Sequence, residues 1–178
     1  TADTYTPDST APSVTNIKLD MNANQLILEF DETVNPTSFD ATQVKFHESS
    51  NKVSTETLTS ASTVASTSPS STVTVNLHVT DVNKVKLVKT MATSATNCYI
   101  VIDSGAMKDM ASVPVANSAK AALANTFVPD TSAPELVSAT INMDTGEVGF
   151  IFDEPVLKDA NKIDFTKIEI FNPITLDK

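Results

Sequence analysis

The sequence predicts an all-β protein built from two sandwich units in tandem, of which the second is incomplete. Three observations lead to this fold class. Short apolar runs alternate with polar residues and are separated by turn residues, which is typical of β-strands. The chain has only 3 Gly but is rich in Ser and Thr, a bias that favours strands and extracellular surfaces over a helical enzyme. The third observation is an internal repeat.

The repeat starts at PDSTAP, residues 7–12, and returns as PDTSAP, residues 129–134. Apolar, turn and acidic positions that follow the two motifs match in one register, which makes the signal strong. The aligned blocks are 12–34 over 134–156 without a gap and, after a two-residue insertion, 39–46 over 163–170. We therefore predict the tail of a preceding unit or a linker, one complete unit, and the N-terminal part (three strands) of a second unit: 1–6, 7–128 and 129–178.

The first unit opens with a predicted antiparallel hairpin. Two apolar runs, residues 14–21 and 25–30, flank the turn Asn-Ala-Asn, and Asp-Thr-Gly takes the place of this turn in the second unit. Alternation at 43–48 predicts a third strand, and residues 72–79 form the clearest two-residue period in the chain. The Ser/Thr-rich stretch between them, 55–71, leaves two interpretations open: a weak edge strand with a loop, or an O-glycosylated face.

The later part of the first unit breaks the β pattern once. Residues 81–92 predict a short crossover helix with Asp81 as its N-cap and Val82, Val85 and Met91 on one face, together with Leu87 or Val88. Residues 97–103 and 120–128 predict the last two strands, joined by a long loop. About seven strands over one unit fit an Ig-like β-sandwich.

In order along the chain, four motifs carry a family resemblance: D-S-T-A-P, then L-x-L-x-F-D-E-x-V with Pro36 and Ser38 behind it, then YIVIDSGAMKDMASVPV, and finally FVPDTSAP. Together they resemble the bacterial-type Ig-like repeats of surface-layer proteins and large adhesins. The LDMN hairpin and the segment DVNKVKLVKTMATSATNCYIVI are more similar to the version found in very large secreted proteins of algae and other microbial eukaryotes. The resemblance covers residues 7–178.

The resemblance implies a secreted or cell-surface modular protein, in which each sandwich is a spacer, an adhesive module or a building block of a fibre. One departure from the family pattern concerns the last long loop, which commonly contains Gly-Asn. This chain has Ala-Ser-Val-Pro there, at residues 111–114, so a different turn is expected in that loop.

Composition excludes several other classes of protein. The net charge is −10 and the 12 basic residues are all Lys, so the Arg contacts typical of nucleic-acid binding are missing. No stretch of about 20 apolar residues is present, and we expect no direct membrane insertion. Cys98 is the only cysteine, which rules out an intrachain disulfide and a thiolate zinc site, and we expect it to be a small buried apolar residue.

Catalytic signals are weak. His47 and His78 each lie inside an alternating predicted strand, where a half-exposed polar role is the usual explanation. No nucleophile elbow, oxyanion-hole glycine or phosphate-binding Gly-rich loop accompanies them. The sequence predicts a protein that is not an enzyme and that has no cofactor other than calcium.

Calcium enters because carboxylates are expected to gather at the ends of the sandwich. A linker and two loops share one pole of an Ig-like unit, and hard oxygen ligands that converge there suit Ca²⁺. A second cluster is expected where the second unit begins, facing Asn22, Asn24 or Asp81 of the first. The other interpretation is that these side chains only cap turns and strand ends. The candidate ligands are Asp8, Asp31, Glu32, Asp109, Asp130, Asp153 and Glu154.

The leading functional hypothesis is a non-enzymatic extracellular module of a long surface protein or filament, acting in extension, adhesion and subunit packing. Two prolines in each linker restrict the backbone, so the junction is predicted to be semi-rigid. The expected partners are neighbouring repeats or other copies of the protein, with strands from another chain completing the second unit. The alternative is an Ig-like module that recognises a carbohydrate or a protein, although Tyr5 and Tyr99 are the only large aromatic residues beside Phe.

Overall fold

The computed structural model describes residues 4–51, 53–117, 122–156 and 164–169. The chain forms two compact units, Thr1–Ala133 and Pro134–Lys178. Residues 129–133, which the repeat assigns to the second unit, therefore group with the first unit in the structure. In the described part of the chain, no helix has the length and apolar character needed to cross a membrane.

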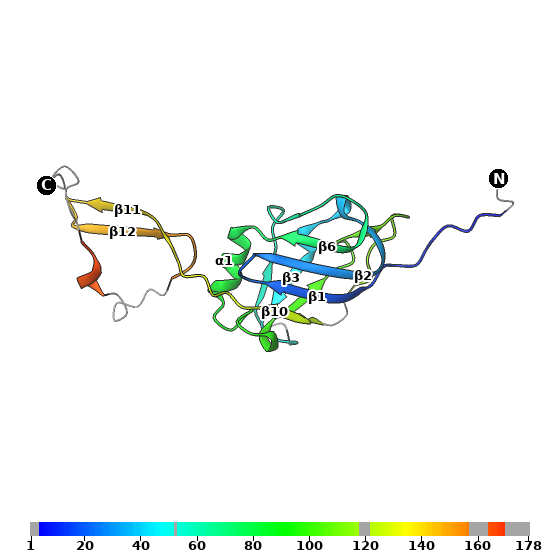
Figure 1. Cartoon of the computed structure of the whole chain (residues 1–178), viewed down its shortest axis with the longest axis horizontal. Coiled ribbons are helices and arrows are strands. Elements are labelled where there is room, and N and C mark those ends of the chain that lie inside the picture. Colours follow the sequence, from blue (N-terminus) through cyan, green and yellow to red (C-terminus); the bar gives the residue numbers. More distant parts are fainter. Residues whose placement is uncertain (1–3, 52, 118–121, 157–163, 170–178) are drawn as a thin grey trace. The chain divides into compact units, whose positions relative to one another are not determined.

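The first unit has two β-sheets that share one core, with most elements belonging to the β class as the sequence predicts (Figure 1). The larger sheet has the strand order β10-β1-β2-β6-β5, and β8 pairs with the far end of β2. All of its pairings are antiparallel except β1 with β10, which is parallel. Its strands are β1 (Val14–Asp20), β2 (Gln25–Asn35), β5 (Thr63–Val64), β6 (Ser70–Asn76), β8 (Lys108–Asp109) and β10 (Thr126–Val128).

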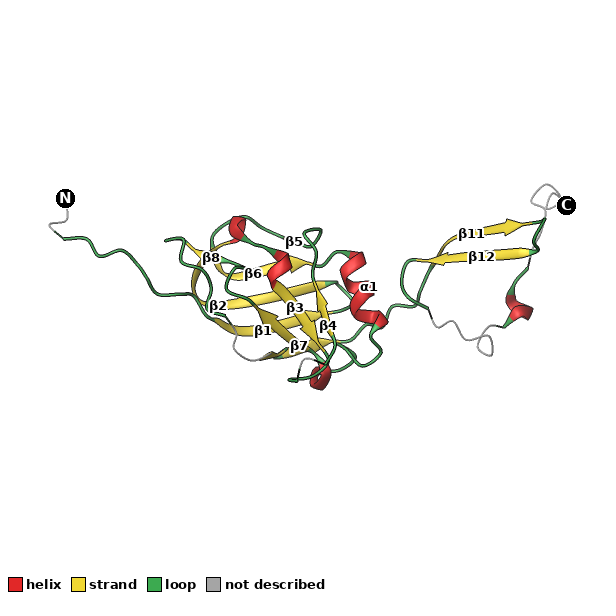
Figure 2. Ribbon diagram, turned by 180° about the vertical axis from the view of Figure 1, so that it is seen from behind, coloured by secondary structure: helices red, strands yellow, loops and turns green. Residues whose placement is uncertain are grey.

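The smaller sheet is antiparallel throughout and has the order β4-β3-β7-β9. Its central strands are short and apolar, with Phe46 and Ile100 directly paired and both buried. Figure 2 shows this sheet with β3, β4 and β7 labelled. Its strands are β3 (Val44–His47), β4 (Thr55–Thr57), β7 (Tyr99–Ile102) and β9 (Ala122–Leu123).

The core lies where alternate side chains of the two sheets meet. Leu26 and Leu28 point inward from the larger sheet and Val44 and Phe46 from the smaller one, as the two-residue period requires. Cys98 also lies in this core, and burial raises the pKa of its thiol to about 12. The prediction that it is a small buried apolar residue is confirmed.

An α-helix, α1 (Val79–Leu87), follows β6, and short 3-10 turns lie elsewhere in the described part of the unit. The predicted helix is confirmed in kind, but its start is not where the sequence placed it. His78 is the N-cap, and its Nδ1 accepts a hydrogen bond from the Thr80 N–H at 3.3 Å. The 3-10 turns are η1 (Pro36–Ser38), η2 (Ala41–Gln43) and η3 (Ala95–Asn97).

Asp81, predicted as the N-cap, is instead a buried residue in the first turn of α1. Its Oδ2 accepts hydrogen bonds from the Thr59 N–H at 2.9 Å and hydroxyl at 3.0 Å, and from the Ser62 hydroxyl at 2.7 Å. Burial alone would raise the pKa of Asp81, but these hydrogen bonds and Lys84 together hold it below its usual value. The carboxylate therefore organises the loop before β5.

Other local predictions need correction. The strand predicted to reach residue 79 ends at Asn76, because His78 turns to cap the helix. His78 is thus outside any strand, and His47, which is in β3, is buried rather than half-exposed. The single strand expected over residues 120–128 is two short strands, β9 and β10, which pair in different sheets.

The Ser/Thr-rich stretch contains β4 and β5 rather than one weak strand. Because of such short strands, the first unit has more strands than the seven expected.

The second unit contains a hairpin of β11 (Leu136–Asn142) and β12 (Glu147–Phe152), as predicted. A 3-10 turn, η5 (Phe165–Lys167), occupies the positions aligned with η2. Of the third strand expected there, residues 168 and 169 are described and form no strand, and the rest lies outside the described residues.

Candidate functional site

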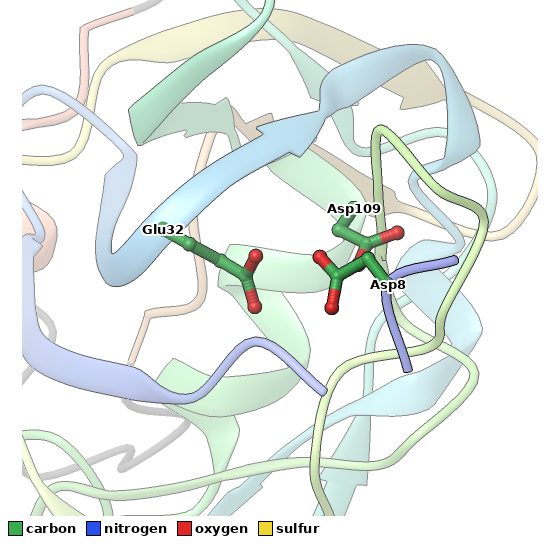
Figure 3. A group of neighbouring side chains, drawn as sticks. All are labelled: Asp8, Glu32 and Asp109. Carbon is green, nitrogen blue, oxygen red and sulfur yellow. The ribbon is translucent and has the colours of Figure 1, made fainter. Parts of the chain in front are cut away.

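Three carboxylates of the first unit meet at one end of the larger sheet (Figure 3). Asp8, Glu32 and Asp109 each offer one oxygen, and these three oxygens all lie within 4.8 Å of one another. The side chains come from the N-terminal segment, β2 and β8, which are far apart in the sequence. Asp31, the fourth carboxylate expected at this pole, is not part of this group of oxygens.

β8 determines where the Asp109 side chain lies. Asp109 pairs with Val34 of β2, two residues beyond Glu32, so the two acidic residues occupy neighbouring strands. The Asp109 N–H donates to the Val113 carbonyl at 3.0 Å, and Asp109 Oδ1 accepts from the Val113 N–H at 2.7 Å. Ser112 takes a φ of 72° to close this loop. Gly and Asn adopt a positive φ more easily than Ser does.

Asp109 is only 3% exposed, and its Oδ2 has no hydrogen-bond partner among the described residues. Glu32 is half-buried and Asp8 is exposed. Burial raises the pKa of Glu32, and the negative charges of Asp8, Asp109 and Asp31 raise it further. The cluster thus concentrates negative charge. It also contains one buried residue, Asp109, whose Oδ2 accepts no hydrogen bond from the described residues.

Asp31 lies next to Glu32 in the sequence but is not part of the group of three carboxylates. Its Oδ1 accepts a hydrogen bond from the Ser13 N–H at 2.8 Å, and its own N–H donates to the Ser13 carbonyl at 3.1 Å. This reciprocal pair holds the start of β1 against β2. For Asp31 the capping interpretation of the carboxylates therefore describes the observed contacts.

In the second unit, Asp153 makes the same pair of bonds with Glu135, at 2.8 and 3.1 Å. Asp153 and Glu154 belong to this unit, whereas Asp130 groups with the first. The second expected cluster stays a prediction.

Asp130 and Thr131 attach the linker to the first unit. Lys86 of α1 forms an ion pair with Asp130 Oδ2 at 2.7 Å, with both side chains largely buried. Asn22 Oδ1 accepts from the Thr131 N–H at 2.8 Å, and Asn22 Nδ2 donates to Thr131 Oγ1 at 3.0 Å. Asn22, one of the three residues named as facing the second expected cluster, thus holds the linker.

The sequence did not reveal these two contacts. Asn22 and Thr131 are 109 residues apart, and neither residue type marks a contact at that separation. Lys86 was assigned only to a helix, and its neighbour Asp130 was considered as a metal ligand. The opposite charges of Lys86 and Asp130 could have indicated an ion pair, but only the fold shows that the two residues lie close together.

The residues that most often carry catalysis are held in structural contacts. His47 is buried and its Nδ1 lies 2.9 Å from the Thr55 hydroxyl, while His78 caps α1. Cys98 is in the core. What the described part offers chemically is a set of hard oxygen donors at one end of the unit and a fastened linker.

Comparison of the chain with protein-family models, curated proteins and solved structures finds no match.

Proposed function

We propose that this chain is a non-enzymatic extracellular module, made of tandem Ig-like sandwiches, that serves extension, adhesion and subunit packing in a long surface protein or filament. The observation that carries the proposal is the fastened linker. A spacer needs the segment that leaves each sandwich to keep a set direction, and Asn22 and Lys86 hold Thr131 and Asp130 for this purpose.

The backbone of the linker supports the same conclusion. Met21 N–H donates to the Val128 carbonyl at 2.9 Å, directly before Pro129. Pro129 and Pro134 restrict their own φ angles and those of the residues before them. A short segment with two prolines and these side-chain contacts loses little further conformational entropy when a neighbouring module packs against it.

The hairpin of the second unit supports a role in packing. Its apolar side chains, among them Ile141, Val148 and Phe150, are exposed in the described structure. Their counterparts in the first unit face a second sheet. Strands supplied by a neighbouring module or by another copy would cover these positions by pairing and packing.

NMR relaxation of the full chain tests the linker. The amides of residues 130–132 are expected to have order parameters of about 0.85, as in the rigid sandwich. Asn22→Ala should lower them toward about 0.6, whereas Asn51→Ala, an exposed loop asparagine, should leave them unchanged. Wild-type values already below about 0.6 would remove the support for a spacer.

Location is tested separately. An antibody against the chain should label intact, unpermeabilised cells or fibres released from them. Labelling only after permeabilisation would contradict the extracellular part of the proposal.

A further inference from the structure

We propose that Asp8, Glu32 and Asp109 bind one Ca²⁺ ion, which fastens the N-terminal segment of the chain to the end of the larger sheet. This goes beyond the proposed structural function, since it assigns a ligand and a switchable attachment. Binding itself does not depend on that function being right.

The buried oxygen of Asp109 is the first reason. A carboxylate oxygen removed from water without a donor is costly, and buried polar groups nearly always have a partner. Oδ1 of Asp109 is satisfied by the Val113 N–H, but Oδ2 has no partner in the described part of the chain. A cation between the three side chains would give this oxygen the partner it lacks.

The second reason is that the three acidic groups converge without a basic residue in the described structure. The ion pairs of the described residues join Lys18 to Glu29, Lys45 to Asp103, Lys84 to Asp81 and Lys86 to Asp130. None of these involves the cluster. Three carboxylates so close together repel one another. A divalent cation replaces that repulsion with attraction.

The chemistry of the donors selects the cation. The cluster offers only carboxylate oxygens, which are hard ligands, and no imidazole or thiolate of the kind zinc prefers. Two oxygens on one Ca²⁺ ion, each about 2.4 Å from it, are at most about 4.8 Å apart, whereas Mg²⁺ requires a tighter octahedron. Three oxygens that all lie within 4.8 Å of one another can therefore reach one Ca²⁺ ion, with water in the remaining positions.

Asp8 is the residue through which calcium would attach the N-terminal segment to the unit. Residues 4–10 are exposed, and among the described residues no backbone hydrogen bond joins residues 4–11 to a strand. The first backbone hydrogen bond that attaches this segment to the rest of the unit is from the Ala116 N–H, in a loop, to the Pro12 carbonyl, at 2.8 Å. Calcium would therefore attach the entering segment at Asp8, while the leaving segment is attached directly by Asn22 and Lys86.

Thermal unfolding and calorimetry of the full chain in 150 mM NaCl test the site. Three protein ligands predict a Kd of about 0.1–1 mM, so 10 mM CaCl2 should raise the Tm by roughly 3–10 °C over EDTA. Glu32→Gln and Asp8→Asn should weaken binding at least about tenfold and remove most of this rise. Glu56→Gln, a half-buried strand glutamate outside the cluster, is the matched control and should keep the whole rise.

The Tm of the variants without calcium gives a further test. In EDTA, both cluster variants should have a slightly higher Tm than the wild type, since each removes one of the repelling charges. Asp8 lies outside every strand, so Asp8→Asn keeps the test valid if Glu32→Gln does not fold. A general loss of stability would instead lower the Tm in both buffers.

Three results would overturn the proposal. The first is no change in the wild-type Tm at 10 mM CaCl2, and the second is an equal calcium effect in the wild type and Glu32→Gln, which would indicate binding elsewhere on the acidic surface. The third is an equal effect of 10 mM MgCl2, which would contradict the assignment to calcium. Failure here leaves the structural role standing, because that role is tested by the order of residues 130–132 and by labelling of cells.

Discussion

The hairpins β1–β2 and β11–β12 have the same local structure but very different surroundings. Both have the same register, with an irregularity between Val14 and Asn16 in one and between the aligned Leu136 and Ser138 in the other. Their exposure differs greatly, since Leu19 is 1% exposed and the aligned Ile141 is 51% exposed. The first hairpin has a second sheet against its apolar face. The described part of the second unit has none.

The comparison separates two sources of structure. Turn residues, alternation and short-range side-chain bonds are enough to define the hairpin and its register, because these interactions lie within about 20 residues of chain. The burial of the hairpin's apolar face depends on other strands, which come much later in the sequence. A two-stranded hairpin alone is only marginally stable in water, so the two copies should differ in stability far more than in shape.

Truncating aligned core positions should show the largest difference between the hairpins. Leu28→Ala removes a side chain that is buried between the sheets and should cost about 2–5 kcal/mol of unfolding free energy. Phe150→Ala, at the aligned and exposed position, should cost less than about 0.5 kcal/mol. Urea unfolding followed by circular dichroism measures both. A cost above about 1 kcal/mol for Phe150→Ala would mean that the second hairpin is covered in solution.

The buried carboxylate of Asp81 should account for the next largest effect, and it stabilises the first unit alone. Asp81→Ala leaves the Thr59 N–H and the Thr59 and Ser62 hydroxyl groups without their acceptor, at a cost of about 3 kcal/mol. The unfolding free energy from urea titration measures this loss. Lys84→Gln is the control, because it removes only the 3.6 Å ion pair with Asp81 and should cost much less.

The lowered pKa of Asp81 also predicts how the stability of the protein changes at acid pH. Its pKa is lowered in the folded protein, so its stabilising contribution is complete above the pKa of the unfolded chain and is lost as the pH falls through the folded value. Wild-type stability should therefore drop in the acid range below about pH 4, and Asp81→Ala should show a smaller drop. Equal slopes for the two proteins would contradict this assignment.

The two aspartates that bond to the start of each hairpin should give a smaller effect, and its part on hydrogen exchange should be alike in both hairpins. Asp31→Ala and Asp153→Ala each remove an acceptor from a backbone N–H, of Ser13 and Glu135 respectively. Hydrogen exchange at these two amides should become faster in both variants, but only Asp31→Ala should lower the unfolding free energy, by about 1 kcal/mol. Asp31→Asn keeps an acceptor and is the control. Unchanged exchange at Ser13 would contradict the role of Asp31.

The two turns should give the smallest effect. Asn24 has a φ of 53° and the aligned Gly146 has a φ of 72°, a region where Gly is the least strained residue. The Asn24 Oδ1 is also buried without a hydrogen bond to the described residues. Asn24→Gly, which copies the second turn into the first, should stabilise the protein by about 0.5 kcal/mol, or roughly 1–2 °C in Tm. A lower Tm would show that Asn24 makes a contribution beyond its backbone conformation.

The predictions from sequence failed where the chain changes direction for tertiary reasons. Residues 72–79 alternate without a break, yet the strand ends at Asn76 because His78 is used to cap α1. Residues 120–128 also look like one strand, but β9 and β10 pair in different sheets. In both places the local pattern allows a strand, and contacts with distant segments determine where it stops.

For the candidate site, the sequence predicted that carboxylates gather at one pole but not which contacts each of them makes. It placed Asp8, Glu32 and Asp109 at one pole, because the order of strands in a sandwich brings those loops together. It could not separate Asp31, which bonds to Ser13, from its neighbour Glu32, which joins the cluster. Adjacent residues of a strand point to opposite sides, and only the register decides which side faces the cluster.

By itself, the sequence determined the β class, the hairpins with their turns, and the aligned acidic positions, because each depends on residues close together in the chain. Only the tertiary structure decided that Leu19 is buried and Ile141 exposed, that Asn22 holds Thr131, and that Asp109 is buried with one oxygen that has no partner among the described residues. These features depend on segments up to about 100 residues apart, and at such separations composition and period carry no information about which side chains meet.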